Sequence, residues 1–297
     1  MLALEHLATE RRNQKTLQLD EMSLREILEV MNEEDQTVAV SVAKEIDSIE
    51  KVVADVIRSF QNGGRLIYIG AGTSGRLGVL DAVECPPTFG TDPQMVLGLI
   101  AGGEAAFVRA AEGAEDDEYL AAAELKQIHV SAADTVIGLA ASGRTPYVIS
   151  ALKYAKQVGA RAHGITCNKA SELAKFADVC VEIETGPEVL TGSTRLKAGT
   201  AQKLVLNMIS TASMIGIGKV YKNLMVDVKP TNQKLVERAK RIIAEAAGVD
   251  RETAEKYYHA ANQNVKAAIV MILLNCGLAE AEAKLKDADG FVRKTLG

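Results

Sequence analysis

The chain has 297 residues, with 34 lysines and arginines against 39 aspartates and glutamates, so its formal net charge is −5. This acidic balance argues against a broad nucleic-acid-binding surface, which needs positive charge over the binding face. Tryptophan is absent and aromatic residues make up 4%, which suits neither stacking on single-stranded bases nor stacking on polysaccharide. The hydrophobic share of 47% is that of a globular chain with a sizeable core.

The four cysteines are scattered, and the nearest pair, Cys167 and Cys180, is 13 residues apart, so no CxxC metal or redox motif is present. Scattered thiols in a chain of this length are typical of a reducing compartment. The N-terminus lacks a signal-peptide pattern, and the longest apolar run near the C-terminus, residues 267–274, is too short to cross a bilayer. We expect a soluble cytoplasmic protein with neither a membrane nor a nucleic-acid partner.

The first sixty residues have a helical pattern. Apolar residues recur at steps of three and four from Val42 to Phe60, the spacing of an amphipathic helix, and Asn62-Gly63-Gly64 ends that pattern. We expect an N-terminal helical arm over residues 1–60, packed on the core.

Five short apolar runs follow, each with Gly, Ser or Asn near its end, at residues 66–69, 95–100, 135–139, 162–166 and 179–183. Segments of helical period separate most of them, at residues 76–83, 117–128 and 146–158. This alternation predicts βαβ units and therefore an α/β fold, with a five-stranded, parallel, doubly wound domain over residues 61–230. Such domains bind ligands at the carboxyl ends of their strands.

The rest of the chain is predicted to be helical. A long helix is expected from about residue 195 to 215, and three or four short helices after Pro230 form a small helical domain over residues 231–297. Asp250 stands three residues before Thr253, so it can cap the helix that follows it.

Two loops have the composition of phosphate-binding sites. Gly70-Ala71-Gly72-Thr73-Ser74-Gly75 follows the first predicted strand and fits the G-x-G-x-x-G pattern. The acidic residue that a dinucleotide site needs after the next strand is missing, and hydroxyls occupy both variable positions, which favours a terminal phosphate. Ala141-Ser142-Gly143-Arg144-Thr145 follows the third strand, with Pro146 in the first turn of the next helix.

Two helix N-termini at one sheet edge predict a monophosphate cradle of backbone N–H groups and hydroxyls. Taken alone, each loop could equally be a capped turn between a strand and a helix. The binding residues expected from the pair are Gly72, Thr73, Ser74, Ser142, Gly143 and Thr145.

Three carboxylates are candidates for a role in the site. Glu84 precedes Cys85-Pro86-Pro87, where the double proline is expected to end the helix; Glu115 lies in an acidic stretch in front of a helix; Glu188 lies in the loop that enters the long helix. Acidic residues also gather at helix N-termini because the helix dipole stabilises them, so the pattern alone assigns none of them to catalysis. The four histidines lack partners at metal-ligand spacing and no GxSxG is present, so we expect neither a metal nor a hydrolase triad.

These loops, in this order, resemble the sugar isomerase (SIS) domain, which binds phosphosugars, and the whole chain resembles the N-acetylmuramic acid 6-phosphate etherase family. The resemblance rests on TERRN (9–13), MNEED (31–35), IGAGTSGRLG (69–78), DAVECPPT (81–88) and GPEVLTGSTRLKAGT (186–200). The helical tail resembles a ubiquitin-associated (UBA)-like bundle, although a packing or dimerisation element is the simpler interpretation.

The resemblance implies a lyase-type etherase of cell-wall sugar recycling that needs no cofactor. It would cleave the D-lactyl ether at C3 of N-acetylmuramic acid 6-phosphate, giving N-acetylglucosamine 6-phosphate and D-lactate. In the family mechanism the ring opens, a base removes the C2 proton next to the C1 aldehyde, lactate leaves with a proton from an acid, and water adds to the unsaturated intermediate. Glu84 matches the family's proton donor and Glu115 its base, and we expect Glu188 to contact the substrate. An acid that works near neutral pH needs a raised pKa, which burial or the charge of a bound substrate can supply.

The position of Glu84 raises a geometric question. It lies about ten residues beyond the glycine loop, roughly 15 Å along a regular helix, which is too far from C3 of a sugar whose phosphate is held at the loop. Either the helix is short and the chain folds back, or Glu84 comes from the other subunit of a homodimer whose site lies near the interface. We expect the second. For the lactyl carboxylate the candidates are Arg76, Arg195 and Lys197.

Two other functions fit the same fold. A phosphosugar isomerase or deaminase shares the phosphate cradle and the carboxylate base, and differs by lacking the segment Glu84-Cys85-Pro86-Pro87 and lactate release. A non-catalytic phosphosugar sensor would bind its ligand without turning it over.

Overall fold

The computed structural model describes residues 7–109, 111–228, 230 and 232–297. The chain divides into two compact units, the first made of Met1–Val83 and Gln94–Ser210, the second of Glu84–Pro93 and Thr211–Gly297. The domain boundaries at residues 60 and 230 stay predictions, and residues 1–6 and 231, where two of the predicted parts begin, lie outside the described residues.

The first unit begins with three 3-10 turns and two helices. The turns are Ala8–Glu10, Gln14–Thr16 and Leu19–Glu21, and the helices are α1 (Leu24–Ala43) and α2 (Ile46–Gln61). Ser23 and Glu26 form a capping box that starts α1. The apolar spacing from Val42 to Phe60 therefore spans two helices, with Val42 buried on α1 and Ile49 and Phe60 buried on α2.

Five parallel strands form one sheet in the order β2-β1-β3-β4-β5. The strands are β1 (Leu66–Gly70), β2 (Val96–Ile100), β3 (Thr135–Leu139), β4 (Arg161–Thr166) and β5 (Val179–Glu182). Every residue of β1 and β3 is buried, as central strands of a sheet covered on both faces should be. The predicted doubly wound α/β class is confirmed, and each predicted strand is found to within one residue at either end.

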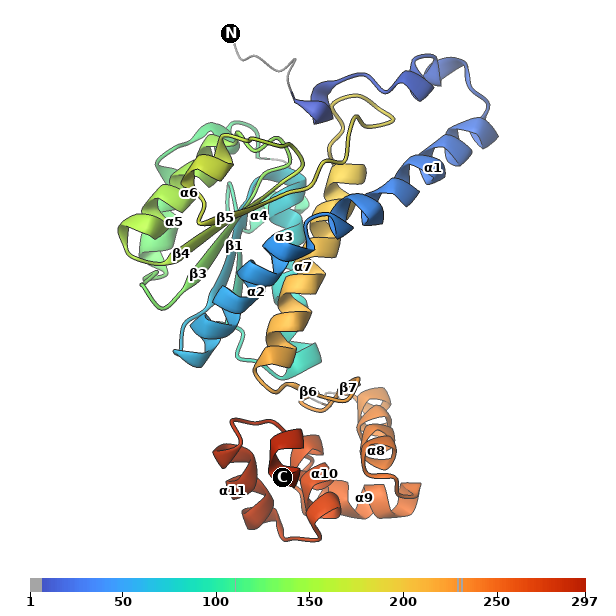
Figure 1. Ribbon diagram of the computed structural model, residues 1–297, viewed down its shortest axis with the longest axis vertical. Coiled ribbons are helices and arrows are strands. Elements are labelled where there is room, and N and C mark those ends of the chain that lie inside the picture. The colour runs from blue at the N-terminus through green and yellow to red at the C-terminus, as the bar shows by residue number, and fades with distance from the viewer. Residues whose placement is uncertain (1–6, 110, 229, 231) are drawn as a thin grey trace. The chain divides into compact units, whose positions relative to one another are not determined.

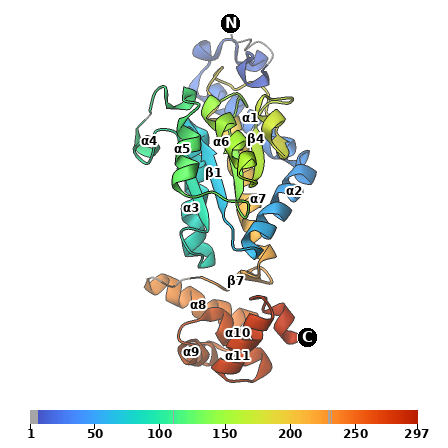
Figure 2. The same cartoon turned by 90° about the vertical axis from the view of Figure 1, so that its left-hand side faces the viewer.

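Helices cover both faces of this sheet (Figure 1 and Figure 2). One face carries α5 (Leu120–Gln127) and α6 (Pro146–Gln157), and the other carries α2, α3 (Gly72–Phe89) and α7 (Lys197–Gly216). A short helix, α4 (Ala105–Val108), follows β2. Gly78 lets α3 approach closely, because a Cβ there would lie 2.9 Å from Cβ of Tyr68 and 3.0 Å from Cδ1 of Leu139.

The double proline does not end α3 as predicted. The helix continues to Phe89, with Pro86 and Pro87 inside its last turn. Each proline lacks the N–H that would donate to the carbonyl four residues earlier, but the last turn is kept helical, and the N–H of Gly90 still donates to the carbonyl of Pro86 at 3.0 Å. As a result, α3 is a single helix of 18 residues, and Glu84 lies within it.

The second unit is mainly helical, as predicted for the tail. Its helices are α8 (Gln233–Ala247), α9 (Arg251–Ala260), α10 (Val265–Leu274) and α11 (Leu278–Asp287), followed by a 3-10 turn at Arg293–Leu296. A small antiparallel pair, β6 (Val220–Tyr221) and β7 (Leu224–Met225), was not predicted. Asp250 caps α9 as predicted, since its carboxylate accepts from the N–H of Thr253 at 2.7 Å.

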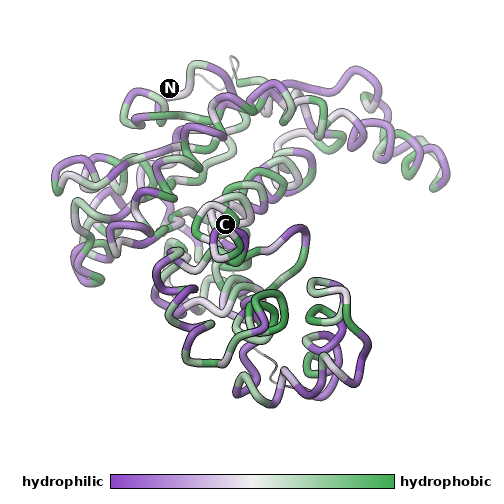
Figure 3. The backbone as a smooth tube through the Cα atoms, turned by 60° about the horizontal axis from the view of Figure 1, so that its bottom comes forward, coloured by the Kyte–Doolittle hydropathy of each residue, from purple (hydrophilic) through white to green (hydrophobic). Residues whose placement is uncertain are grey.

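Hydrophilic and hydrophobic residues alternate along most of the helices, as they do in helices that cover a core on one side (Figure 3). Within the part of the chain that the structure describes, no helix has both the length and the apolar character needed to cross a membrane.

Candidate active site

The two predicted phosphate loops leave the sheet side by side. Strands β1 and β3 are neighbours, and Gly70 pairs with Leu139 at their carboxyl ends. The first loop then opens α3 at Gly72, and the second opens α6 at Pro146. The strand order reverses between β1 and β3, and this switch point is where open α/β sheets bind ligands. The structure therefore brings the residues of both loops to one edge.

In the first loop, glycine is required where the strand end and the helix start cross. A Cβ on Gly75 would lie 2.5 Å from the carbonyl oxygen of Gly70, and Gly72 has a left-handed φ of 53°. Ser74 is buried, and its hydroxyl donates to Oε1 of Gln202 on α7 at 2.8 Å. Thr73 is half-buried, and its hydroxyl has no hydrogen-bond partner among the described residues. A ligand can therefore be met here by the Thr73 hydroxyl and by backbone N–H groups at the start of α3.

The second loop has a similar design. Gly143 has a φ of 70°, and the oxygen of the Ser142 hydroxyl accepts from the N–H of Arg144 at 3.3 Å. Thr145 occupies the N-cap position of α6, with Pro146 next to it, and its side chain makes no capping hydrogen bond. The hydroxyl of Thr145 is thus available to a ligand at the N-terminus of α6.

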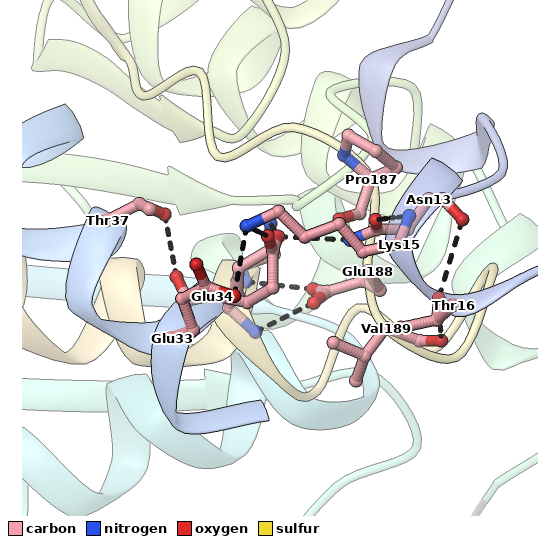
Figure 4. Close-up of polar contacts among 11 residues, drawn as sticks. Asn13, Lys15, Thr16, Glu33, Glu34, Thr37, Pro187, Glu188 and Val189 are labelled. Carbon is pink, nitrogen blue, oxygen red and sulfur yellow. Dashed lines mark hydrogen bonds and ion pairs between the residues drawn. The ribbon is translucent and has the colours of Figure 1, made fainter. Parts of the chain in front are cut away.

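Glu188 acts as a buried cap of α7 (Figure 4). The residue is 0% exposed, and its two carboxylate oxygens accept from the N–H groups of Lys197 at 2.9 Å and Ala198 at 3.0 Å. These groups would otherwise lack partners in the first turn of the helix. Burial raises the pKa of Glu188, and the two hydrogen bonds act against that rise. The expected contact of Glu188 with the substrate stays a prediction, and what the structure gives it is a structural role.

The three basic candidates for the lactyl carboxylate differ in how far their charge is already paired. Lys197 is 3% exposed, and its Nζ donates to Oε2 of Glu34 at 2.5 Å. Arg76 donates through Nε and Nη2 to two carbonyl groups of α4, both at 2.9 Å. Arg195 is exposed and makes no hydrogen bond or ion pair with another described residue. Lys197 is therefore ion-paired, Arg76 is held by neutral carbonyl groups, and Arg195 is the most exposed of the three.

A polar network that sequence reasoning missed lies beside Glu188 (Figure 4). Glu34 on α1 is 8% exposed; its Oε2 accepts from Lys197 and, at 3.0 Å, from Nδ2 of Asn13, and its Oε1 lies 3.2 Å from Nζ of Lys15. Burial raises the pKa of Glu34, but the hydrogen bonds from Lys197, Lys15 and Asn13 outweigh it, and the net pKa is lowered. One sequence signal pointed to this network: residues 9–13 and 31–35 belong to the stretches that carry the family resemblance, although the sequence analysis gave them no function.

The two predicted catalytic glutamates are both exposed. Glu115 lies in a 3-10 turn, Ala114–Asp116, which contacts α6. Ala114 in this turn also lies near Gly102, just after β2, so Glu115 is at the carboxyl edge as expected. Glu84 lies twelve residues after Gly72 in the uninterrupted α3, a rise of about 18 Å. The possibility of a short helix that folds back on itself is therefore excluded for Glu84.

The sequence is highly similar to curated proteins along its whole length. A protein of Bacillus cytotoxicus named N-acetylmuramic acid 6-phosphate etherase is 70% identical over 293 residues, covering 99% of this chain and 100% of that protein. A protein of the same name from Geobacillus sp. (strain WCH70) is 69% identical over 293 residues, with 99% of each chain covered. The chain belongs to the N-acetylmuramic acid 6-phosphate etherase family.

The fold of this etherase family member agrees with broader matches. Residues 48–156 match the glucokinase regulatory protein N-terminal SIS domain, and residues 118–212 match the SIS domain. A phosphoheptose isomerase from Francisella tularensis shares the fold, with a TM-score of 0.51 and 12% identity, covering 65% of this chain and 100% of that chain. The predicted SIS fold is confirmed. Among the described residues of the etherase, no group of three or more His, Cys, Asp or Glu side chains is placed to hold a metal ion.

Proposed function

We infer that this chain is an etherase that cleaves the D-lactyl ether of N-acetylmuramic acid 6-phosphate, giving N-acetylglucosamine 6-phosphate and D-lactate in the recycling of cell-wall sugar. The observation that carries this conclusion is the 70% identity with a protein of that name over 99% of the chain. The site geometry agrees with it, because two glycine- and hydroxyl-rich helix starts meet at the switch point of the sheet.

We propose that these two helix starts hold the substrate's phosphate. The first N–H groups of α3 and α6 have no hydrogen-bond partner within their helices, and both helix dipoles favour a negative charge at these N-termini. The hydroxyls of Thr73 and Thr145 add two donors. Gly72, Ser74, Ser142 and Gly143 contribute backbone groups and the left-handed turns that let the phosphate approach.

The proposed reaction is an elimination followed by an addition. In the ring-opened sugar, the carboxylate of Glu115 takes the C2 proton, which is acidic because the C1 aldehyde stabilises the resulting enolate. The electron pair then forms the C2–C3 double bond, the bond from C3 to the lactyl oxygen breaks, and Glu84 protonates the departing lactate. Water adds its oxygen to C3 and a proton returns to C2, so the product gains one water in exchange for lactate.

We propose a homodimer in which Glu84 serves the site of the partner subunit. The straight helix α3 carries Glu84 away from its own glycine loop. Leu80 and Val83, on the same stretch of α3, are 44% and 58% exposed, and Leu24 and Leu28 on α1 are 82% and 67% exposed. Exposed apolar groups at helical spacing support burial against another chain.

The first experiment measures D-lactate release from N-acetylmuramic acid 6-phosphate by wild type, Glu84→Ala, Glu115→Ala and the matched control Glu112→Ala. We expect release by wild type and control, and losses of about 10²-fold or more in the two other variants. In D₂O, Glu84→Ala should still exchange the C2 proton of the substrate and Glu115→Ala should not. A phosphosugar that binds without lactate release would favour the sensor function instead.

The dimer is tested by mixing subunits. A heterodimer of Glu84→Ala and Glu115→Ala chains has one site with both carboxylates if these come from different subunits, so activity should return to about half per dimer. No recovery, with mixed dimers demonstrated by mass, would contradict the shared site.

We further propose that the enzyme works in the cytoplasm. Its four cysteines are free thiols in the structure, two of them, Cys85 and Cys167, buried, which suits a reducing compartment.

A further inference from the structure

Side chains of the N-terminal segment, residues 7–23, bind the backbone of the loop around Glu188, which leads into α7. The hydroxyl of Thr16 donates to the carbonyl of Val189 at 2.8 Å, and Nδ2 of Asn13 lies 3.4 Å from the carbonyl of Pro187. Both donors belong to buried residues, and Figure 4 shows them facing this loop. Together with the two bonds from the first turn of α7 to Glu188, these bonds hold the backbone of the loop in place.

The Glu34–Lys197 pair joins α1 to the first turn of α7. The two side chains are 10% and 4% exposed, and their charged atoms are 2.5 Å apart. A desolvated ion pair of this kind is stable only when its geometry is fixed and its remaining hydrogen-bonding groups have partners. Asn13 and Lys15 supply those partners to Glu34, so the N-terminal segment completes the pair.

Helix α7 in turn holds the glycine loop. Ser74 donates to Gln202, one turn beyond the start of α7, and a Cβ placed on Gly199 would lie 3.4 Å from Cγ2 of Thr73. The first two turns of α7 therefore pack directly on the residues that open α3. A shift of α7 along its axis would move or release Thr73 and Ser74.

The N-terminal segment also reaches the second loop. The N–H of Thr9 donates to Oδ1 of Asn168 at 3.4 Å, and Nδ2 of Asn168 donates to the hydroxyl of Thr9 and to the carbonyl of Ala141, both at 3.0 Å. Asn168 is 2% exposed and Thr9 is 0% exposed. Because Ala141 stands directly before Ser142, this chain of bonds ties the segment to the second phosphate loop.

We propose that the N-terminal segment, with Glu34 and Lys197, is a strap that positions both phosphate-binding loops for the sugar phosphate. The proposal rests on the function inferred above, in that these loops bind the substrate's phosphate. Glu34, Lys197 and Thr16 are positioning residues: they are bound to the protein itself and act on the ligand through α7 and the loops.

The first test measures binding of N-acetylglucosamine 6-phosphate by calorimetry to the full-length protein. Thr16→Val keeps the shape of the side chain and removes its donor, and Glu34→Gln removes the charge. We expect each to weaken binding about tenfold and to raise KM more than it lowers kcat, whereas Lys197→Arg, which keeps the charge, should retain most of the affinity. Glu29→Gln is the matched control, the same change on α1 at a side chain that is 61% exposed.

The second test uses hydrogen exchange of the protein without ligand. In Thr16→Val and Glu34→Gln, the backbone amides of residues 72–75 and 197–198 should exchange about tenfold faster, while those of β3 and β4 keep their protection. Unchanged exchange at 72–75, or binding losses no larger than in Glu29→Gln, would overturn the strap. If wild type binds the phosphosugar but releases no lactate, the etherase function fails while the binding test still decides the strap. If the wild-type protein does not bind the phosphosugar, hydrogen exchange alone decides whether the strap positions the loops.

Discussion

Removing Glu34 alone from the Glu34–Lys197 pair is expected to destabilise the chain more than removing both members. In Glu34→Leu, Nζ of Lys197 stays buried, with its side chain 4% exposed, and loses the acceptor at 2.5 Å that is its one hydrogen-bond partner among the described residues. A buried charge left in this way costs about 3–5 kcal/mol of unfolding free energy.

Removing Lys197 instead of Glu34 is expected to lower the free energy of unfolding by less. In Lys197→Met, the carboxylate of Glu34 keeps Lys15 at 3.2 Å and Asn13 at 3.0 Å, so the loss is that of one charge-assisted hydrogen bond, about 1–3 kcal/mol. In the double variant both buried charges are gone, and Lys15, whose side chain is 49% exposed, can be hydrated. Replacing a buried ion pair by apolar groups of similar volume is often close to neutral, so we expect the double variant to lose less than about 1 kcal/mol, far less than Glu34→Leu alone.

The assay is urea unfolding at pH 7, followed by circular dichroism, with each transition of the two-unit chain fitted separately and midpoints compared at unchanged slope. The exposed pair Arg25–Glu29 on the same helix, 2.9 Å apart, is the control and should contribute about 0.3–0.5 kcal/mol with little coupling. If the two single losses simply add in the double variant, the pair does not act as a unit and the argument from burial is refuted.

Three further changes test other parts of the site and fold. Gly143→Ala should cost about 2–4 kcal/mol and abolish phosphosugar binding, because its φ is 70° and the new Cβ would lie 2.5 Å from Cβ of Ser171; thermal unfolding and calorimetry check both. Burial alone would raise the pKa of Asp134, but the Arg65 guanidinium and backbone N–H donors lower it overall. The ionised carboxylate therefore stabilises the folded chain at pH values above the pKa that Asp134 has in the unfolded chain. This stabilisation is lost as the pH falls through the lower pKa of Asp134 in the folded chain. Asp134→Asn should therefore lose about 2 kcal/mol at pH 7, and unfolding curves should show the difference from wild type shrinking below about pH 4. Arg195→Gln should change stability by less than about 0.5 kcal/mol yet weaken substrate binding about tenfold, measured as KM, since its exposed charge is unpaired within the described residues.

The sheet and the positions of the two glycine loops could be predicted from sequence because their signals are local. Strands such as β3 are short apolar runs with a turn residue at each end, and the glycines at positions 72 and 143 mark left-handed turns that few other residues tolerate. The adjacency of the two loops then follows from the topology of a parallel sheet, without knowledge of any side-chain contact.

The strap could not be predicted, because its contacts join residues far apart in the chain. Glu34 and Lys197 are separated by 163 positions, and Thr9 and Asn168 by 159. Nothing in the local pattern around Glu34, an acidic residue in an acidic stretch, predicts that it is buried. The end of α3 was also mispredicted from a local signal: Pro86 and Pro87 each remove one helix hydrogen bond, yet the helix continues past them to Phe89.

Burial distinguishes Glu188 and Glu34 from Glu84 and Glu115, the two glutamates that we propose to act in catalysis. Both oxygens of Glu188 accept backbone N–H groups, and both oxygens of Glu34 are paired with cations, so both carboxylates are buried and already engaged with the protein. Glu84 and Glu115 are exposed and have no hydrogen-bond partner among the described residues. A general acid or base must be open to the proton it moves, and only the second pair meets that condition. For Glu84 to act as the proposed acid near neutral pH, the substrate or the proposed partner subunit must supply the dry surroundings that such an acid needs.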